Sequence, residues 1–232
     1  MTRPDLLSAT PQAESRQRRR ILRMLAASGL SASNALQFAL AQQSQSAQGM
    51  RQARGDVRVN NNSAAEGTRV QPGDTVSTGA DGIAMFTVGG DAYLLRPNST
   101  VQLAGSGLFP NLMRVLTGKL MGVFATGSPR QLASTTATIG IRGTGAYMEA
   151  EPERTYFCLC YGSAEVQAAG SSARDEYSTT HHESPRYIYA DGRSGAIVPA
   201  SVINHTDAEL IMLESLVDRT PPRAFMESTN RY

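Results

Sequence analysis

The sequence has few of the residues that mark disulfide-rich scaffolds or polyelectrolytes. Its 232 residues include no Trp and two Cys, only 6% are aromatic, and only 18% are charged. Two Cys exclude a disulfide-dense scaffold, and so few charges exclude a disordered polyelectrolyte. The only Lys is Lys119, so nearly all positive charge is on Arg, which favours fixed hydrogen-bonded pairs over a diffuse cationic coat.

Glycine is abundant, with 21 residues, and it separates short apolar runs along most of the chain. This composition indicates many turns and short strands, and it argues against a helical bundle or a coiled coil. The length is sufficient for one domain with a sizeable core.

The positive charge is concentrated at the start of the chain. The whole sequence has 22 basic and 20 acidic residues, and the first 41 residues hold six Arg and two acids, which leaves 16 basic against 18 acidic side chains. A leading basic run indicates either a nucleic-acid arm or the beginning of an export signal. Because the remainder is slightly acidic, we expect no nucleic-acid partner.

An export signal explains this basic run best. Residues 24–41 contain no charge, are rich in Ala and Leu, and end in Ala-Leu-Ala, which predicts cleavage between Ala41 and Gln42. Arg18 and Arg19 begin a pattern similar to a twin-arginine signal. We therefore expect a periplasmic protein. The alternative is an uncleaved segment that anchors the chain in the inner membrane facing the periplasm, although several polar residues make it a poor span.

After residue 54 the chain alternates apolar and polar residues in brief runs between Gly, Asn and Asp turns, which is typical of strands and hairpins. More than ten short strands predict a mainly-β domain, built as a solenoid-like roll, a barrel or a sandwich. The expected strands are 56–60, 68–70, 75–78, 83–88, 93–96, 100–103, 115–120, 122–125, 134–138, 147–149 and 155–161.

A series of turn motifs resembles the FecR-type periplasmic domain, the sensor portion of bacterial cell-surface signalling regulators. In order, the motifs are Gly55-Asp56-Val57-Arg58-Val59-Asn60, Gly67, residues 70–76 (VQPGDTV), 78–82 (TGADG), 94–101 (LLRPNSTV), Gly118-Lys119-Leu120 and 138–145 (TIGIRGTG). The resemblance covers residues 55–168, near half of the chain. It implies a β-rich, non-enzymatic domain that relays signals in the periplasm.

The chain departs from such regulators at its start. Only about 17 residues precede the basic run, which leaves no room for a folded sigma-factor-binding domain. We therefore expect a stand-alone exported version that acts through a partner, either an envelope protein or an envelope ligand.

The segment Arg142-Gly143-Thr144-Gly145 is a possible ligand loop. Its Gly residues permit either an exposed run of backbone N–H groups, with Arg142 facing an anion, or a bulged strand with Arg142 paired inside the fold. It is not a phosphate-binding P-loop, because no Lys-Ser or Lys-Thr follows.

The residues best suited to metal chemistry lie in the C-terminal third. Cys158 and Cys160 are two apart on an expected strand and so share one face, where neighbours two apart cannot readily form a disulfide with each other. If the following hairpin returns beside them, His181 or His182 could join the thiols, and such a set suits zinc or copper. Adjacent His residues on a strand point to opposite faces, so at most one would join. The alternative is that both Cys are small buried hydrophobes and both His lie at a polar strand end.

Near the end of the chain, Thr206 and Glu209 form a capping box that predicts a helix with an apolar stripe. No catalytic constellation emerges from the sequence, so we expect a non-enzymatic signalling or binding module, with a metal-binding or redox protein as the alternative. The expected organisation is an export signal at 1–41, a flexible tether at 42–54, a FecR-like β domain at 55–200, a C-terminal helix segment at 201–222 and a loose tail at 223–232.

Overall fold

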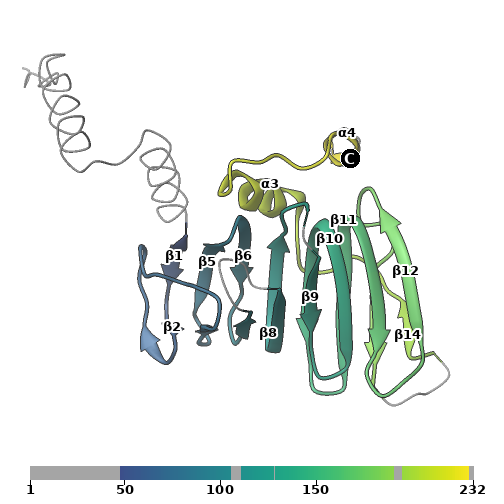
Figure 1. Ribbon diagram of the computed structural model, residues 1–232, viewed down its shortest axis with the longest axis horizontal. Helices are drawn as coiled ribbons and strands as arrows, with labels where there is room; N and C mark the ends of the chain where they lie inside the picture. The colour runs from purple at the N-terminus through teal and green to yellow at the C-terminus, as the bar shows by residue number, and fades with distance from the viewer. Residues whose placement is uncertain (1–47, 106–110, 128, 191–194, 230–232) are drawn as a thin grey trace, which may run out of the picture. The chain divides into compact units, whose positions relative to one another are not determined.

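β-Strands hold about half of the residues described by the computed structural model, which are 48–105, 111–127, 129–190 and 195–229. The described part belongs to one unit, residues 47–232 (Figure 1). The export signal, with Arg18, Arg19, Ala41 and Gln42, lies outside the described residues. None of the described helices is long and apolar enough to cross a membrane.

The described strands belong to a single 14-stranded sheet in which one pairing, between β8 and β9, is parallel and the others are antiparallel. Two short helices, α3 and α4, follow the strands, which confirms a mainly-β fold with a helix near the C-terminus. The strands are β1 (Gly49–Arg54), β2 (Val57–Val59), β3 (Asn62–Ser63), β4 (Thr75–Thr78), β5 (Ile83–Val88), β6 (Asp91–Leu95), β7 (Thr100–Ala104), β8 (Leu112–Val123), β9 (Arg130–Ala133), β10 (Ala137–Ala150), β11 (Arg154–Ala168), β12 (Arg174–Thr179), β13 (Arg186–Tyr189) and β14 (Ile197–Pro199).

Three long strands, β8, β10 and β11, connect the two halves of the sheet. The first part of β8 pairs with β7, while its last residues pair with β6 and β10. In the same way, β11 pairs with β13 near its start and with β12 near its end. Since each long strand has different neighbours at its two ends, the sheet folds over on itself.

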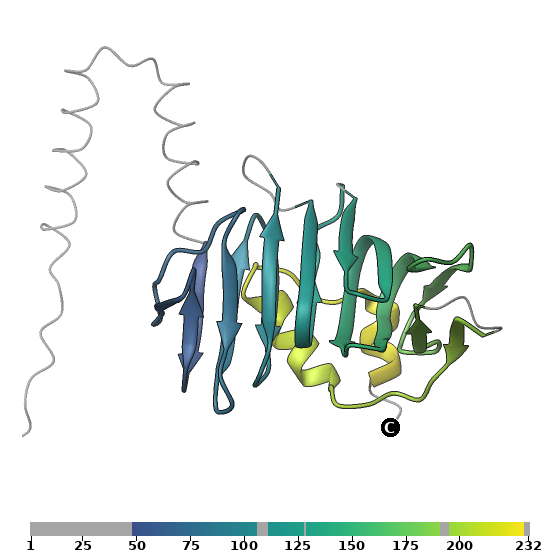
Figure 2. The same ribbon diagram turned by 90° about the horizontal axis from the view of Figure 1, so that it is seen from below.

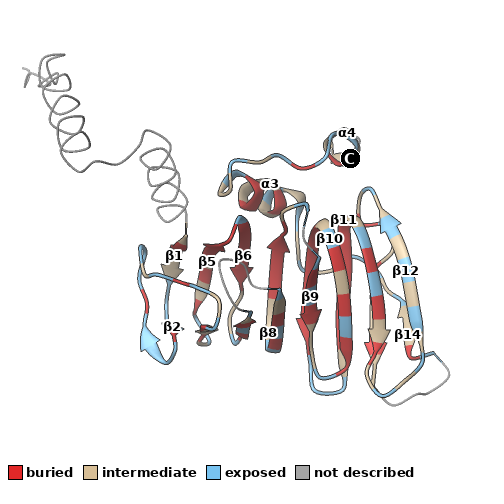
Figure 3. Cartoon of the chain, in the orientation of Figure 1, coloured by how far each residue is buried: buried red, intermediate tan, exposed pale blue. Residues whose placement is uncertain are grey.

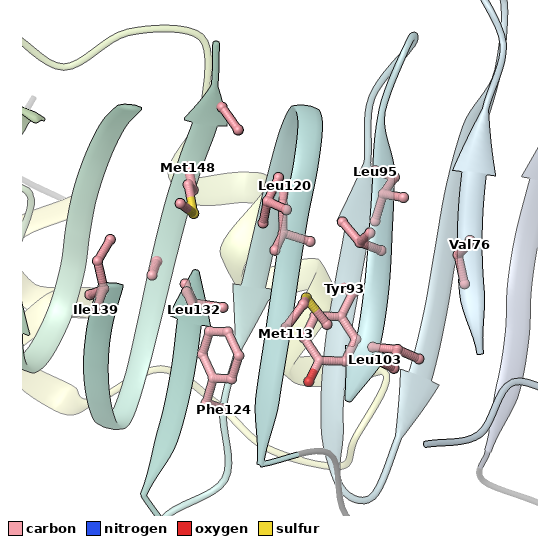
Figure 4. Packing of buried hydrophobic residues seen from close by; sticks show 14 of the residues in the cluster. Val76, Tyr93, Leu95, Leu103, Met113, Leu120, Phe124, Leu132, Ile139 and Met148 are labelled. Atoms are coloured by element: carbon pink, nitrogen blue, oxygen red, sulfur yellow. The ribbon is translucent and has the colours of Figure 1, made fainter. Parts of the chain in front are cut away.

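The main core gathers apolar side chains from both halves of this folded sheet. Figure 4 shows Leu103, Met113 and Leu132 in this cluster, from β7, β8 and β9, and all three are at most 2% exposed. In Figure 3 the long strands are mostly buried, whereas β12 is largely exposed or intermediate. Apolar and polar residues alternate in β7, where Val101 and Leu103 are buried and Gln102 between them is exposed, so the strand gives one face to the core.

A second apolar cluster lies on the other face of β6, β8, β10 and β11, beneath the C-terminal helices α3 (Asp207–Ser215) and α4 (Arg223–Thr229). Figure 2 shows these helices, in yellow, lying across one side of the strands. The capping box predicted at Thr206 and Glu209 is present, and it starts α3. Leu210, Leu213 and Phe225 are fully buried and hold the helices on this face.

Several element boundaries differ from the prediction. Residues 49–54, expected in the tether, form β1 because they pair with β5 and bury Met50. Residues 223–229, expected in a loose tail, form α4, because Phe225 on this helix is buried in the second apolar cluster. Runs predicted as separate strands at 115–120 and 122–125 are joined through Met121 in the single strand β8, which ends at Val123, since Gly118 and Gly122 both keep their pairing with β10. The expected strand at 134–138 is mainly the turn between β9 and β10.

The glycine of the Gly118-Lys119-Leu120 motif allows a close backbone approach inside the sheet. Gly118 has φ of +87°, and an added Cβ would lie against Ser99 and the Asn98 carbonyl. We expect Gly118→Ala to lower the free energy of unfolding by about 1–3 kcal/mol more than Gly67→Ala does. Gly67 is the matched control because its φ is +83° but nothing lies near its added Cβ. Denaturant unfolding measures both, and equal losses would contradict this account of the motif.

Candidate metal centre

Strand β11 carries Cys158 and Cys160 through the second apolar cluster. Both thiols point to the same face, as the two-residue spacing predicts, and both residues are fully buried and free of disulfide bonds. The Cys160 thiol donates a weak hydrogen bond to the Cys158 carbonyl, with 3.8 Å between sulfur and oxygen. The strand therefore presents two sulfur ligands side by side.

The turn after β12 brings His182 against these thiols. His182 adopts the left-handed conformation, with φ of +56°, and its backbone N–H donates to the Cys160 carbonyl. This turn directs the imidazole inward, so that Nδ1 lies 3.4 Å from the Cys158 sulfur. The exposed fraction of His182 is 9%, which makes it a buried neighbour of both thiols.

The fourth residue, His205, comes from the segment before α3 and was missed by the sequence analysis. Its Nε2 lies 3.1 Å from His182 Nδ1, and its Nδ1 donates to the Ile203 carbonyl at 2.6 Å. The ring stacks on Tyr147, with centroids 4.6 Å apart and an interplanar angle of 19°. These contacts fix the orientation of His205 and leave Nε2 directed at His182 and the thiols.

Hydrogen bonds around the two inner imidazoles determine which nitrogens carry hydrogen. A carbonyl only accepts, so the His205 hydrogen is on Nδ1, and a carboxylate only accepts, so His182 Nε2 donates to Asp207 at 2.9 Å. The lone pair of His205 Nε2 therefore faces His182 Nδ1 at 3.1 Å, beside the Cys158 sulfur. His205 Nε2, His182 Nδ1 and the Cys158 sulfur can lie this close together when one cation is shared between them, either a proton on His182 Nδ1 or a metal ion.

The spacing of the four residues suits a tetrahedral metal ion. The four inner ligand atoms of Cys158, Cys160, His182 and His205 all lie within 4.8 Å of one another. Around tetrahedral Zn²⁺, two nitrogens would be about 3.3 Å apart, and a nitrogen and a sulfur about 3.6 Å apart. The observed 3.1 Å and 3.4 Å are close to these separations.

Asp207, the first residue of α3, supports the centre from outside. Its second carboxylate oxygen accepts from His181 Nε2 at 2.8 Å, and the carboxylate also accepts from the Thr229 hydroxyl at 2.9 Å. His181 thus takes part through Asp207, and its ring does not belong to the four-residue ligand set. Of the two adjacent His residues only His182 meets the thiols, in agreement with the expectation that at most one would.

The pKa shifts describe a charged cluster. The hydrogen bond with Cys160 is the main cause that lowers the pKa of Cys158 to about 4. Hydrogen bonds with His182 and His205 also lower this pKa, whereas burial opposes the shift. Burial raises the pKa of Cys160. Burial opposes charge on His182, but Cys158 and Asp207 raise its pKa above the usual value. The Cys158 thiolate is the form that binds metals.

Cys158, His182 and Asp207 also follow the thiol–imidazole–carboxylate order of an activated nucleophile. A catalytic thiol has to reach its substrate, but Cys158 is 0% exposed and lies among apolar side chains under the C-terminal helices. Burial of both sulfurs therefore favours the role of metal ligand over that of nucleophile.

The Arg142-Gly143-Thr144-Gly145 segment belongs to β10, where the pairing with β11 shifts between Arg142 and Gly145. The bulge of the second arrangement is present, with Gly143 at φ of +54° and Thr144 fully buried, but Arg142 is not enclosed in the fold as that arrangement expected. Arg142 is exposed and borders an open groove that Glu165 and Glu176 also line. An anion there would meet two carboxylates as well as Arg142, while Arg130, which also lines the groove, is paired with Asp91.

Replacing Asp207 with Asn tests its supporting role. The amide keeps the shape but has a single oxygen, so it cannot accept from His181 and His182 at the same time, and the orientation of His182 would be less fixed. We expect the affinity for Zn²⁺ to fall about 10–100-fold, as for other residues that orient a metal-ligating His. Competition with a chromogenic chelator measures the affinity, and an unchanged value would contradict the supporting role of Asp207.

Solved structures that match this chain at low identity include two from one organism. Both are crystal structures of a candidate anti-sigma factor from Parabacteroides distasonis, each 13% identical to this chain. One alignment covers 55% of this chain and 59% of that chain with a TM-score of 0.45, and the other covers 60% and 64% with a TM-score of 0.47. The chain thus spans less than two thirds of either structure. No protein-family model and no curated protein matches the chain.

Proposed function

We propose that this protein is a zinc-binding module in which Cys158, Cys160, His182 and His205 hold one Zn²⁺. One observation carries the proposal. The chain contains only two Cys and three His residues, spread over 48 positions of a 232-residue sequence, and all five belong to two groups of ligand-type side chains that share His182. A fold that used these residues only as ordinary core or surface side chains would have no reason to bring all of them together.

The chemistry of the ligand set favours zinc. Two thiolates and two imidazoles form a closed set of four, which is the usual composition of a structural zinc site. Carboxylates and carbonyls, which Mg²⁺ and Ca²⁺ prefer, are absent from this set of four. Two thiolates neutralise Zn²⁺, whereas Cu⁺ would leave a net negative charge buried beside Asp207, and uncompensated buried charge is costly.

The proposed metal also fits the proposed compartment. We propose that the chain is exported to the periplasm through its twin-arginine signal, with the inner membrane as the alternative location of an uncleaved form. Free thiol pairs are exposed to oxidation in such compartments, and Zn²⁺ coordination would protect them. Because the centre is buried beneath α3 and α4, the metal would enter while these helices are not docked.

A second candidate function is a non-enzymatic FecR-like module that relays a signal or binds an envelope protein or ligand. It is supported by the turn motifs of the sequence, since Gly73, Asn98 and Gly118 all have the positive φ that such turns need. The two functions are compatible, because a zinc centre can hold together a domain whose exposed surface binds a partner.

Purification after native export, followed by elemental analysis, tests the first proposal. We expect about one zinc per chain, and an intact mass equal to that of a chain whose first residue is Gln42. Less than about 0.1 zinc per chain would overturn it, and stoichiometric copper would reassign the metal. For the second candidate, substrate turnover in an unbiased hydrolase screen, together with the absence of any co-purifying envelope partner, would count against it.

A further inference from the structure

The C-terminal segment, residues 200–229, forms a strap across the second apolar cluster. It contains only α3, of nine residues, and α4, of seven. Helices this short are not stable alone in water, so the strap depends on docking for its order. The side chains that dock it include Leu210, Leu213 and Phe225, all 0% exposed.

The strap covers a face of the sheet that is otherwise apolar. Leu94 of β6, Met121 of β8 and Tyr147 of β10 lie beneath it, and all are at most 5% exposed. If the strap moved away, these side chains would form an exposed apolar patch of the kind that marks interaction sites. The position of the strap therefore decides what surface the protein presents.

The four proposed zinc ligands are divided between the sheet and the strap. Cys158 and Cys160 come from β11 and His182 from the turn after β12, whereas His205 belongs to the strap. Asp207, which orients His182, also belongs to the strap, and Thr229 at its far end bonds to Asp207. A metal ion in the centre would link the two parts of the molecule directly.

Other polar contacts can guide the strap to its place without a metal ion. Arg96 donates to Glu209 and to the Asn204 carbonyl, and Tyr161 donates to Glu214. The Arg96–Glu209 pair remains partly exposed, at 28% and 23%, where ion pairs contribute little. These contacts can set where the strap docks without a metal ion.

We propose that zinc acts as a latch: the bound ion holds the strap closed, and its loss lets the strap open while the sheet stays folded. This inference rests on the proposed zinc-binding function and makes the protein a sensor of zinc. An ion that binds only the closed form suppresses opening in proportion to its concentration. At free zinc of 100 times the Kd, opening becomes about 100-fold rarer.

Hydrogen exchange of the full mature chain tests the latch, with EDTA-treated protein compared with protein in buffered zinc. In the zinc-free chain we expect the amides of α3 to exchange at least about 100-fold faster than those of β10. Zinc at 100 times its Kd should then slow α3 by about 100-fold. If zinc binds but α3 already exchanges as slowly as β10 without it, or is not slowed by it, the latch is wrong and the zinc site stands. If zinc does not bind, both proposals fail.

Two strap variants complete the test. His205→Gln removes the only ligand on the strap, so α3 should exchange rapidly even in zinc while β10 stays protected. Arg223→Ala is the matched control, because the Arg223 side chain is 92% exposed and forms its ion pair with Glu227 of the same helix. The control should keep the zinc response. Loss of protection in β10 of His205→Gln would mean that the residue supports the whole fold, and this would contradict the latch.

Discussion

Replacing His182 with Ala is expected to weaken zinc binding by at least about 1,000-fold, whereas replacing its neighbour His181 should change it less than about tenfold. The reason is geometric. His182 Nδ1 lies 3.4 Å from the Cys158 sulfur and 3.1 Å from His205 Nε2, while His181 Nε2 donates to the outer carboxylate oxygen of Asp207. Removing His182 deletes a ligand, and removing His181 deletes one of several hydrogen bonds to a supporting residue.

The adjacent pair forms its own control, because both variants delete the same side chain in the same turn. Isothermal titration or chelator competition gives the two affinities, and circular dichroism shows whether each variant retains its β structure. Equal losses of affinity would mean that the turn as a whole, and not the position of one nitrogen, determines binding. If the His182→Ala variant still bound zinc tightly, His182 would not be a ligand.

The second large effect concerns thermal stability. Zinc at 1,000 times its Kd stabilises a folded chain that binds it by about 4 kcal/mol, if the unfolded chain binds none. For a domain of this size, each kcal/mol shifts the Tm by about 2–4 °C. We therefore expect zinc to raise the Tm by about 8–16 °C.

The double variant Cys158→Ser, Cys160→Ser is the control for this shift. Serine is close in shape to cysteine but does not supply a thiolate, so the Tm of the variant should not respond to zinc. Differential scanning calorimetry of both proteins, with and without EDTA, measures the effect. A zinc-dependent rise in the double variant, or none in the natural chain, would contradict a centre built on the two sulfurs.

Much of the fold follows from local sequence pattern. The strands at 75–78 and 83–88 were predicted with the bounds that the structure has, because alternation between Gly and Asp turns is a local signal. The sequence did not show that β8, β10 and β11 are long strands shared by both halves of the sheet. Their continuity depends on pairing partners far along the chain, which periodicity does not reveal.

The candidate centre was predicted in part for the same reason. The shared face of Cys158 and Cys160 follows from strand geometry, and the choice of His182 over His181 depends on a left-handed turn that only the structure reveals. His205 was missed because it lies 45 residues from Cys160 and reaches it only when the strap packs on the sheet. Its one available signal was scarcity, since it is the third His in a chain that has only three.

X-ray absorption at the zinc edge, on protein purified after native export, tests the central claim most directly. The account predicts one zinc per chain with two sulfurs at about 2.3 Å and two nitrogens at about 2.0–2.1 Å, in tetrahedral geometry. A first shell of oxygens, or a shell without sulfur, would contradict the assignment of Cys158, Cys160, His182 and His205 as the ligands.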